Sequence, residues 1–232
     1  MIMSSCDTQR NIQAVAFDMD GLMYDTEKVY WKAAEVLLGR RNCPYTEELC
    51  DDIMGRPAEY CFRRMIEYYS LDEDWRAMQQ ESEEIFLSLL EQDGAEPMPG
   101  LFALLDELER RGIPKAVCTS SSRRSMSAVL RKDQLEPRFD FVITSQDIVR
   151  GKPDPEIYLT AATRFGFEPA SVLVLEDSVA GTRAAIAAGA PCFVVLAEHN
   201  RHLSFPSATK VLTSLDDPQL FDLLRSTLPR KV

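Results

Sequence analysis

The sequence lacks several features that would assign it to a class at once. No apolar run approaches the roughly 20 residues that a transmembrane helix requires, so we expect no membrane partner. There is no basic excess either: 26 Lys and Arg stand against 37 Asp and Glu, a net charge of −11. Nucleic-acid binding needs a basic footprint, and its absence argues against such a partner. The first residues show no charged start followed by an apolar core, so no secretory signal is expected.

Cysteines are present but are not spaced for metal binding or for a disulfide framework. The six cysteines include no CxxC pair and no zinc-finger spacing, which favours reduced, mostly buried thiols in a cytoplasmic protein. Among the cysteines, Cys118 is the one that could act as a nucleophile, because it lies beside the polar residues at the end of a predicted strand. Neither of the two histidines lies near it in the sequence, which argues against this role.

Apolar runs alternate with helical periodicity over the second half of the chain, and 45% of all residues are apolar. Such alternation is typical of a parallel sheet that is covered by helices on both faces. The sequence therefore predicts an α/β fold with a Rossmann-like parallel-sheet core. The tail after Arg201 is expected to hold a loop, a short strand and a closing helix. The five main strands are predicted at residues 13–18, 115–120, 140–145, 171–177 and 191–196.

Residues 26–94 interrupt this alternation, because they carry helical periodicity without a strand signal. We predict that they form an inserted all-helical cap domain, and that residues 1–25 and 95–232 form the core. The two joins fall at residues 24–26 and 93–100, where Gly and Pro suit a hinge. Asp25 and Thr26 are expected to anchor this hinge or to cap the first inserted helix, with substrate contact as the lesser alternative.

Polar side chains gather where the predicted strands end. Ligands of open parallel sheets bind at the carboxyl ends of the strands. Several acids, a hydroxyl and a lysine at one edge need a shared partner, because buried carboxylates without partners are costly. The residues at these ends are Asp18, Asp20, Thr119, Ser120, Lys152, Glu176 and Asp177.

Four segments, in this order, resemble the motifs of the haloacid dehalogenase superfamily of phosphotransferases: "DMDGLMYDTE", "CTSS", "GKPDPEIY" and "LEDSVAG". The helical insert resembles the cap of its beta-phosphoglucomutase-like branch. The resemblance implies a Mg²⁺-dependent enzyme that transfers phosphate through an aspartyl intermediate. Dehalogenation does not fit, because dehalogenases need no proton shuttle at Asp20. A signalling receiver domain would carry its acidic pair before the phosphorylated Asp and would need no helical insert.

The first motif explains why two aspartates end one strand. Phosphoryl transfer needs a nucleophile, charge neutralisation and in-line positioning. Asp18 is predicted to be the nucleophile, since a carboxylate can form a covalent intermediate. Asp20 would lie on the same side if extended geometry continues, and it is predicted to be the general acid and base. Taken alone, this pair would equally suit an exposed turn or a helix cap.

The remaining motif residues are predicted to hold metal and phosphate. Mg²⁺ prefers hard oxygen ligands, and the candidate ligands are Asp18, Asp20, Glu176 and Asp177. Glu176 would either ligate directly or orient Asp177, which by itself would also suit a helix cap. Lys152 would pair with the nucleophile and the phosphate rather than with solvent. The Thr119 hydroxyl and the Ser120 N–H would face the phosphate at a helix N-terminus, whereas Ser121 and Ser122 would cap that helix.

The substrate would be a small phosphorylated metabolite, and we expect a monomeric phosphomonoester hydrolase. A sugar phosphomutase of the beta-phosphoglucomutase type is the alternative. That mutase carries an Arg a few residues beyond the Gly of its cap loop, whereas here Arg56 directly follows Gly55. Gly55 and Arg56 are nevertheless the candidate substrate-binding residues of the cap, because an Arg can grip a phosphate or carboxylate with two hydrogen bonds. A surface Arg beside a helix is the alternative for Arg56.

Overall fold

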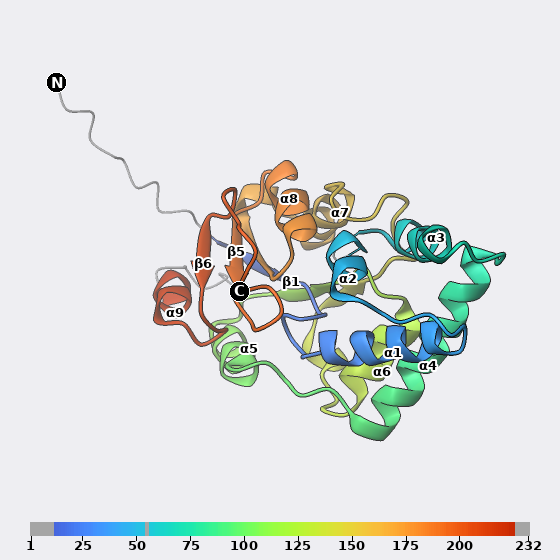
Figure 1. Ribbon diagram of the computed structural model, residues 1–232. Coiled ribbons are helices and arrows are strands. Elements are labelled where there is room, and N and C mark those ends of the chain that lie inside the picture. The colour runs from blue at the N-terminus through green and yellow to red at the C-terminus, as the bar shows by residue number, and fades with distance from the viewer. Residues whose placement is uncertain (1–11, 54–55, 226–232) are drawn as a thin grey trace.

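The computed structural model describes residues 12–53 and 56–225, and within them six strands form one parallel sheet (Figure 1). The strand order is β3-β2-β1-β4-β5-β6, so β1 lies at the centre between β2 and β4. This order brings together the strand ends that carry the predicted site residues. The strands are β1 Ala14–Phe17, β2 Lys115–Cys118, β3 Phe141–Ile143, β4 Val172–Glu176, β5 Cys192–Val195 and β6 Lys210–Leu212.

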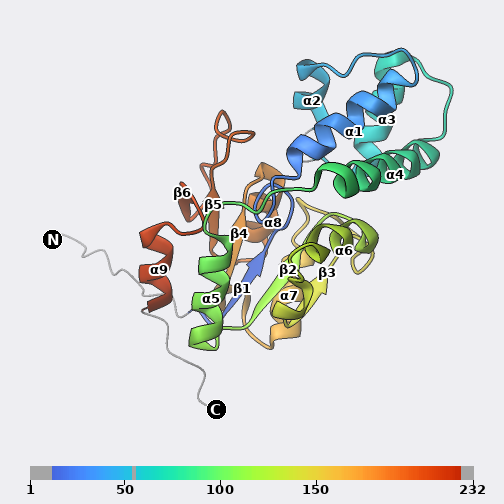
Figure 2. The ribbon, with the colours of Figure 1, turned by 90° about the horizontal axis from the view of Figure 1, so that it is seen from below.

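Each central strand is buried on both faces because its side chains alternate between two apolar clusters. In β1, Val15 and Phe17 join one cluster, while Ala14 and Ala16 join the other. Helices α5 (Leu101–Arg111), α6 (Arg123–Arg131) and α9 (Pro218–Arg225) supply the first cluster. Helices α7 (Glu156–Phe165) and α8 (Val179–Ala187) supply the second (Figure 2). The α/β fold class with a parallel-sheet core is therefore confirmed.

Local signals in the sequence account for where these helices begin and end. Helix α5 stops at Gly112 and α7 at Gly166, both in the left-handed conformation that favours glycine. Helix α6 begins after Ser122 and α8 after Ser178, and each serine accepts a hydrogen bond from the backbone N–H three residues on. Ser178, and not Asp177, therefore caps α8. No helix within the described part of the chain is long and apolar enough to cross a membrane.

Four helices lie in the described part of residues 26–94, as the periodicity predicts: α1 Glu27–Gly39, α2 Glu47–Ile53, α3 Ala58–Tyr69 and α4 Trp75–Asp93. They pack beyond the carboxyl ends of the strands (Figure 2). The two connections to the core run side by side: the Asp25 N–H donates to the Glu96 carbonyl, and the Met98 N–H to that of Met23. The division of the chain into a core and a cap domain remains a prediction.

Candidate active site

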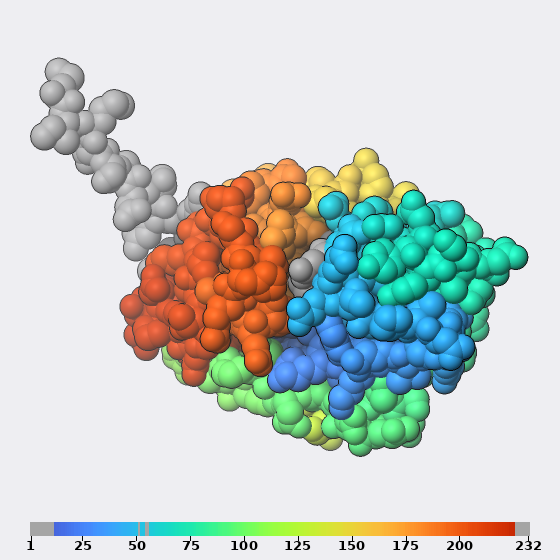
Figure 3. All heavy atoms as spheres, viewed as in Figure 1, coloured from blue at the N-terminus to red at the C-terminus, as the bar shows by residue number. Residues whose placement is uncertain are grey.

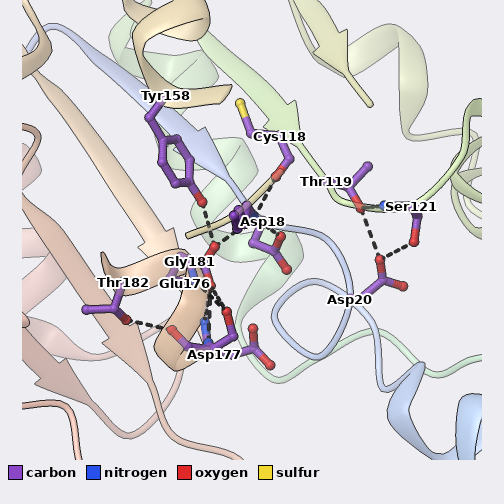
Figure 4. Close-up of polar contacts among 12 residues, drawn as sticks. Asp18, Asp20, Cys118, Thr119, Ser121, Tyr158, Glu176, Asp177, Gly181 and Thr182 are labelled. Carbon is purple, nitrogen blue, oxygen red and sulfur yellow. Dashed lines mark hydrogen bonds and ion pairs between the residues drawn. The ribbon is translucent and has the colours of Figure 1, made fainter. Parts of the chain in front are cut away.

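The carboxyl ends of β1, β2 and β4 meet beneath the helical segment. Asp18 follows β1, Thr119 follows β2, and Glu176 and Asp177 lie at the end of β4. All four side chains are buried. Figure 4 shows them converging on one region of the sheet edge. At the surface, the blue-to-cyan helices α1 and α2 meet the orange part of the core along a furrow (Figure 3).

Lys152 is the cation of this region, and its ammonium group is buried among oxygen atoms. Its Nζ lies 2.5 Å from Asp18 Oδ1 and 2.7 Å from Glu176 Oε1, and it donates to the Cys118 carbonyl at 3.0 Å. Burial acts to lower the pKa of Lys152, but the charges of Asp18 and Glu176 outweigh it and hold the pKa above its ordinary value. Lys152 therefore stays charged and joins the β1 and β4 carboxylates.

Glu176 has both carboxylate oxygens engaged by the protein itself. Oε1 accepts from Lys152 and, at 2.6 Å, from the Tyr158 hydroxyl, while Oε2 accepts from the backbone N–H groups of Asp177 and Ser178 and from the Ser178 hydroxyl. Burial acts to raise the pKa of Glu176, yet Lys152 and these hydrogen bonds lower it overall. A Cβ at Gly181 would collide with this carboxylate. Such full engagement is typical of a residue that orients its neighbours.

Asp177 is contacted at its backbone carbonyl and at one of its carboxylate oxygens. Asn200 donates its side-chain N–H to the Asp177 carbonyl at 2.8 Å, and His199 Nε2 lies 2.7 Å from Oδ2. Gly21 adopts a positive φ of 75° directly beside them, where a Cβ would collide with Asp177 Oδ2. Burial and then the charge of Glu176 raise the pKa of Asp177 well above its ordinary range.

Asp18, Glu176 and Asp177 form the one acidic group, among the described residues, whose ligand oxygens all lie within 4.8 Å of one another. Three carboxylates against the single ammonium of Lys152 leave a formal charge of −2 when all are ionised. Burial raises the pKa of Asp18 as well, so the ionised group is costly without more positive charge. An oxygen donor set with this charge deficit fits a hard divalent cation such as Mg²⁺.

Asp20 has a different environment, although it is only two residues from Asp18. Its Oδ1 accepts from the Thr26 hydroxyl at 2.9 Å, and its Oδ2 accepts from the hydroxyls of Thr119 at 3.0 Å and Ser121 at 2.7 Å. Burial raises the pKa of Asp20, and the three hydroxyl donors oppose this shift. The carboxylate points toward Thr119 and Ser121 in Figure 4. Its carboxylate is not part of the group of Asp18, Glu176 and Asp177, and the predicted role of Asp20 as a metal ligand stays a prediction.

The other predicted site residues that the structure describes make no contact with the acidic group or with Asp20 among the interactions described above. Ser120 is exposed. Arg56 is exposed as well and stacks on the Tyr60 ring, 5.3 Å from its centroid. Gly55 lies outside the described residues. Cys118 is buried, and burial raises the pKa of its thiol to about 12, so it is poorly suited to act as a nucleophile.

Several residues of the site make contacts that were not predicted from the sequence. Tyr158 lies within a helical pattern, and only the fold turns its hydroxyl toward Glu176. Thr26 takes the position before α1 without a capping hydrogen bond, and its hydroxyl serves Asp20 instead. His199 and Asn200 follow β5, so the rule that polar residues collect at strand ends would have found both.

Comparison with known proteins supports the family that the sequence motifs resemble. The sequence pattern described as haloacid dehalogenase-like hydrolase matches residues 15–195. A phosphorylated carbohydrates phosphatase of Thermotoga maritima is 35% identical over 182 residues, 77% of this chain and 82% of that protein. A Drosophila melanogaster protein named probable pseudouridine-5'-phosphatase is 33% identical over 225 residues, 92% and 95% of the two chains. The structure of a Thermotoga maritima protein assigned as a beta-phosphoglucomutase has 28% identity, a TM-score of 0.72 and coverage of 94% and 100%.

The parallel α/β sheet carries a buried aspartate–lysine pair and an acidic group at its strand ends, where the predicted motifs lie. The chain belongs to the haloacid dehalogenase-like hydrolases, in the branch related to beta-phosphoglucomutase. Within that family it is a phosphatase. The family, the fold class and the enzyme class predicted from the sequence are thus confirmed.

Proposed function

We propose that the protein is a Mg²⁺-dependent phosphomonoester hydrolase that acts on a small phosphorylated metabolite through an aspartyl-phosphate intermediate. One observation carries this proposal: the two carboxylates at the end of β1 occupy different environments. Asp18 pairs with Lys152 beside the acidic group, whereas Asp20 is surrounded by hydroxyl donors. Carboxylates with different surroundings can take different roles in one reaction.

In the first step, an oxygen of the Asp18 carboxylate attacks phosphorus and the bond from phosphorus to the ester oxygen breaks. Protonated Asp20 gives its proton to that departing oxygen, so an alcohol leaves. In the second step, Asp20 removes a proton from a water molecule, whose oxygen attacks phosphorus. Asp18 is released and inorganic phosphate forms. The raised pKa of Asp20 suits both transfers, because the group must carry and release a proton near neutral pH.

Other residues of the site would bind the phosphoryl group and the metal ion during these steps. Lys152 faces Asp18, and with the Thr119 hydroxyl and the Ser120 N–H it would bind phosphoryl oxygens. Asp18 and Asp177 would hold Mg²⁺, while Glu176 orients Asp177 and Lys152 through its hydrogen bonds. When bound, Mg²⁺ neutralises the carboxylates and the phosphoryl group so that anion can approach anion.

The relatives guide the choice of substrate. Their names specify phosphorylated carbohydrates and pseudouridine 5'-phosphate, so a sugar or nucleoside monophosphate is the substrate class that we infer. Gly55 and Arg56 remain the candidate cap residues for its recognition. A sugar phosphomutase is the alternative function, favoured by the likeness to the assigned beta-phosphoglucomutase. We further infer a cytoplasmic monomer that binds neither nucleic acid nor membranes, in keeping with its acidic charge.

A screen of phosphorylated sugars, nucleotides and small alcohols tests the proposal. Release of inorganic phosphate in Mg²⁺ is expected for at least one compound, with Asp18→Asn as the inactive control. Conversion of a sugar 1-phosphate into its 6-phosphate without net phosphate release would identify the mutase instead. Phosphate release that continues at full rate in Asp18→Asn would contradict the assignment of the nucleophile.

A further inference from the structure

Helix α4 of the cap region reaches the core at one acidic residue, Glu83. Its carboxylate accepts hydrogen bonds from the hydroxyls of Ser122 and Ser125, at the N-terminal end of α6. The Ser125 contact is 3.0 Å long. The carboxylate is therefore fixed at the junction between the helical segment and the strand-end loop that carries Thr119.

This junction adjoins the proposed acid–base residue. Ser121, the residue before Ser122, donates its hydroxyl to Asp20, and the Tyr30 hydroxyl lies 2.9 Å from Ser121 Oγ. Burial, and then the charge of Asp20, raise the pKa of Tyr30, and the charges of Glu27 and Glu83 add smaller contributions in the same direction. Because Asp20 must reach the oxygen of the leaving group, the leaving group has to lie in this same region.

The charge of Glu83 is not compensated by a basic side chain. Within the described ranges no ion pair of 4.0 Å or less includes Glu83, and Arg123 of α6 pairs with Asp147 at 3.2 Å instead. Lys152 is committed to Asp18 and Glu176. The N-terminal end of α6 and two serine hydroxyls are thus the groups that contact the carboxylate.

Capping of α6 does not explain the acid. Ser122 already caps the helix, because its hydroxyl accepts from the Ser125 N–H at 3.1 Å. A glutamine at position 83 would accept the same two hydroxyl donors without a charge. The negative charge of Glu83 therefore has a different effect, which is to repel a second anionic group from the region beside Asp20.

We propose that Glu83 is a specificity-determining residue that makes the enzyme prefer phosphate monoesters whose leaving group is uncharged over those whose leaving group carries a second phosphate or a carboxylate. This inference rests on the proposed function. It narrows the substrate class to the phosphate monoesters of neutral polyols, sugars and nucleosides. It also disfavours sugar bisphosphates, the doubly anionic compounds that a phosphomutase has to hold.

The matched pair sn-glycerol 3-phosphate and 3-phosphoglycerate tests this, because the two differ chiefly by a hydroxymethyl against a carboxylate. Selectivity is the ratio of their kcat/KM values. For a compound that binds without turnover, the inhibition constant against hydrolysis of p-nitrophenyl phosphate replaces kcat/KM. We expect the wild type to favour the glycerol compound, and Glu83→Gln to reduce this selectivity about 10- to 100-fold, as for charges several ångströms apart at a partly buried site.

Glu84→Gln is the matched control, since Glu84 is the adjacent acid of α4 and is exposed. It removes the same charge without touching α6 and should leave the selectivity as in the wild type. Unchanged selectivity in Glu83→Gln, or an equal change in Glu84→Gln, overturns the role of Glu83. Failure of the wild type to hydrolyse any phosphate monoester, p-nitrophenyl phosphate included, would instead overturn the proposed function.

Discussion

Asp20→Asn tests most directly whether the two aspartates of β1 have separate roles. Asparagine keeps the size of Asp20 and can still bond to Thr26, Thr119 and Ser121, because hydroxyl groups can either donate or accept. It cannot carry a proton to the leaving oxygen. General acid–base catalysis contributes about 10²- to 10⁴-fold, so kcat for an alkyl phosphate should fall by that factor, about 3 to 5 kcal/mol in activation free energy.

The fold should tolerate this change. The negative charge of Asp20 adds to the repulsion that, after burial, raises the pKa values of Asp18 and Asp177. Removing it relieves the crowded group, so the melting temperature of Asp20→Asn should equal or exceed that of the wild type. A loss of activity with an unchanged melting temperature would therefore report on chemistry and not on folding.

The assay compares leaving groups. With p-nitrophenyl phosphate the first step needs little protonation, whereas the second step still needs Asp20 as a base. Stopped-flow measurements on Asp20→Asn should therefore show a burst of p-nitrophenol close to one equivalent, followed by slow turnover. Asp106 is an exposed aspartate that pairs with Arg138, and the control variant Asp106→Asn should behave like the wild type. Equal losses on alkyl and aryl phosphates without a burst would refute the assignment of Asp20.

Four further predictions concern the nucleophile, the metal, the buried lysine and pH. Asp18→Asn should abolish turnover of alkyl and aryl phosphates alike; rates near those of the wild type would exclude a covalent Asp18. EDTA should abolish activity, Mg²⁺ should restore it and Ca²⁺ should do so poorly, while the rise in melting temperature with Mg²⁺ should vanish in Asp177→Asn. Lys152→Met should lower the free energy of unfolding in EDTA by about 3 to 5 kcal/mol, as expected for a broken buried pair, whereas exposed Lys132→Met should change it little by urea titration. Glu107, whose pKa is lowered to about 2 by Arg110 and Arg111, stabilises the fold above its ordinary pKa near 4.5. Its contribution, below about 1 kcal/mol at such a solvent-screened site, should disappear as the pH falls toward 2, so urea curves of Glu107→Gln and wild type should converge there.

Much of the fold could be predicted from the sequence because its signals are local. Strands that are buried on both faces read as near-continuous apolar runs, and β1, β2, β4 and β5 do so apart from Lys115 and Glu176 at strand ends. Gly112 and Gly166 mark helix ends because glycine adopts the left-handed conformation readily. The helices α1 to α4 follow from their 3.6-residue periodicity alone.

Part of the site could also be predicted from the sequence. Asp18, Thr119, Glu176 and Asp177 could be grouped because parallel strands deliver their carboxyl ends to one edge. Asp18 and Asp20 were expected on the same side only if extended geometry continues past the strand, and this condition does not hold. Strand β1 ends at Phe17, and a bridge from Asp20 to Tyr24 turns the chain, so the two carboxylates have separate partners.

The tertiary structure alone decided which distant groups meet. Lys152 lies 134 residues from Asp18, and Glu83 lies 39 residues from Ser122, yet each pair is bonded. No periodicity or spacing encodes such contacts, because they depend on the order of the strands in the sheet and on how the inserted helices pack above it. The sequence by itself determined which side chains stand at the strand ends. The tertiary structure determined which of them contact Asp18, which contact Asp20, and that Glu83 of the insert contacts the start of α6.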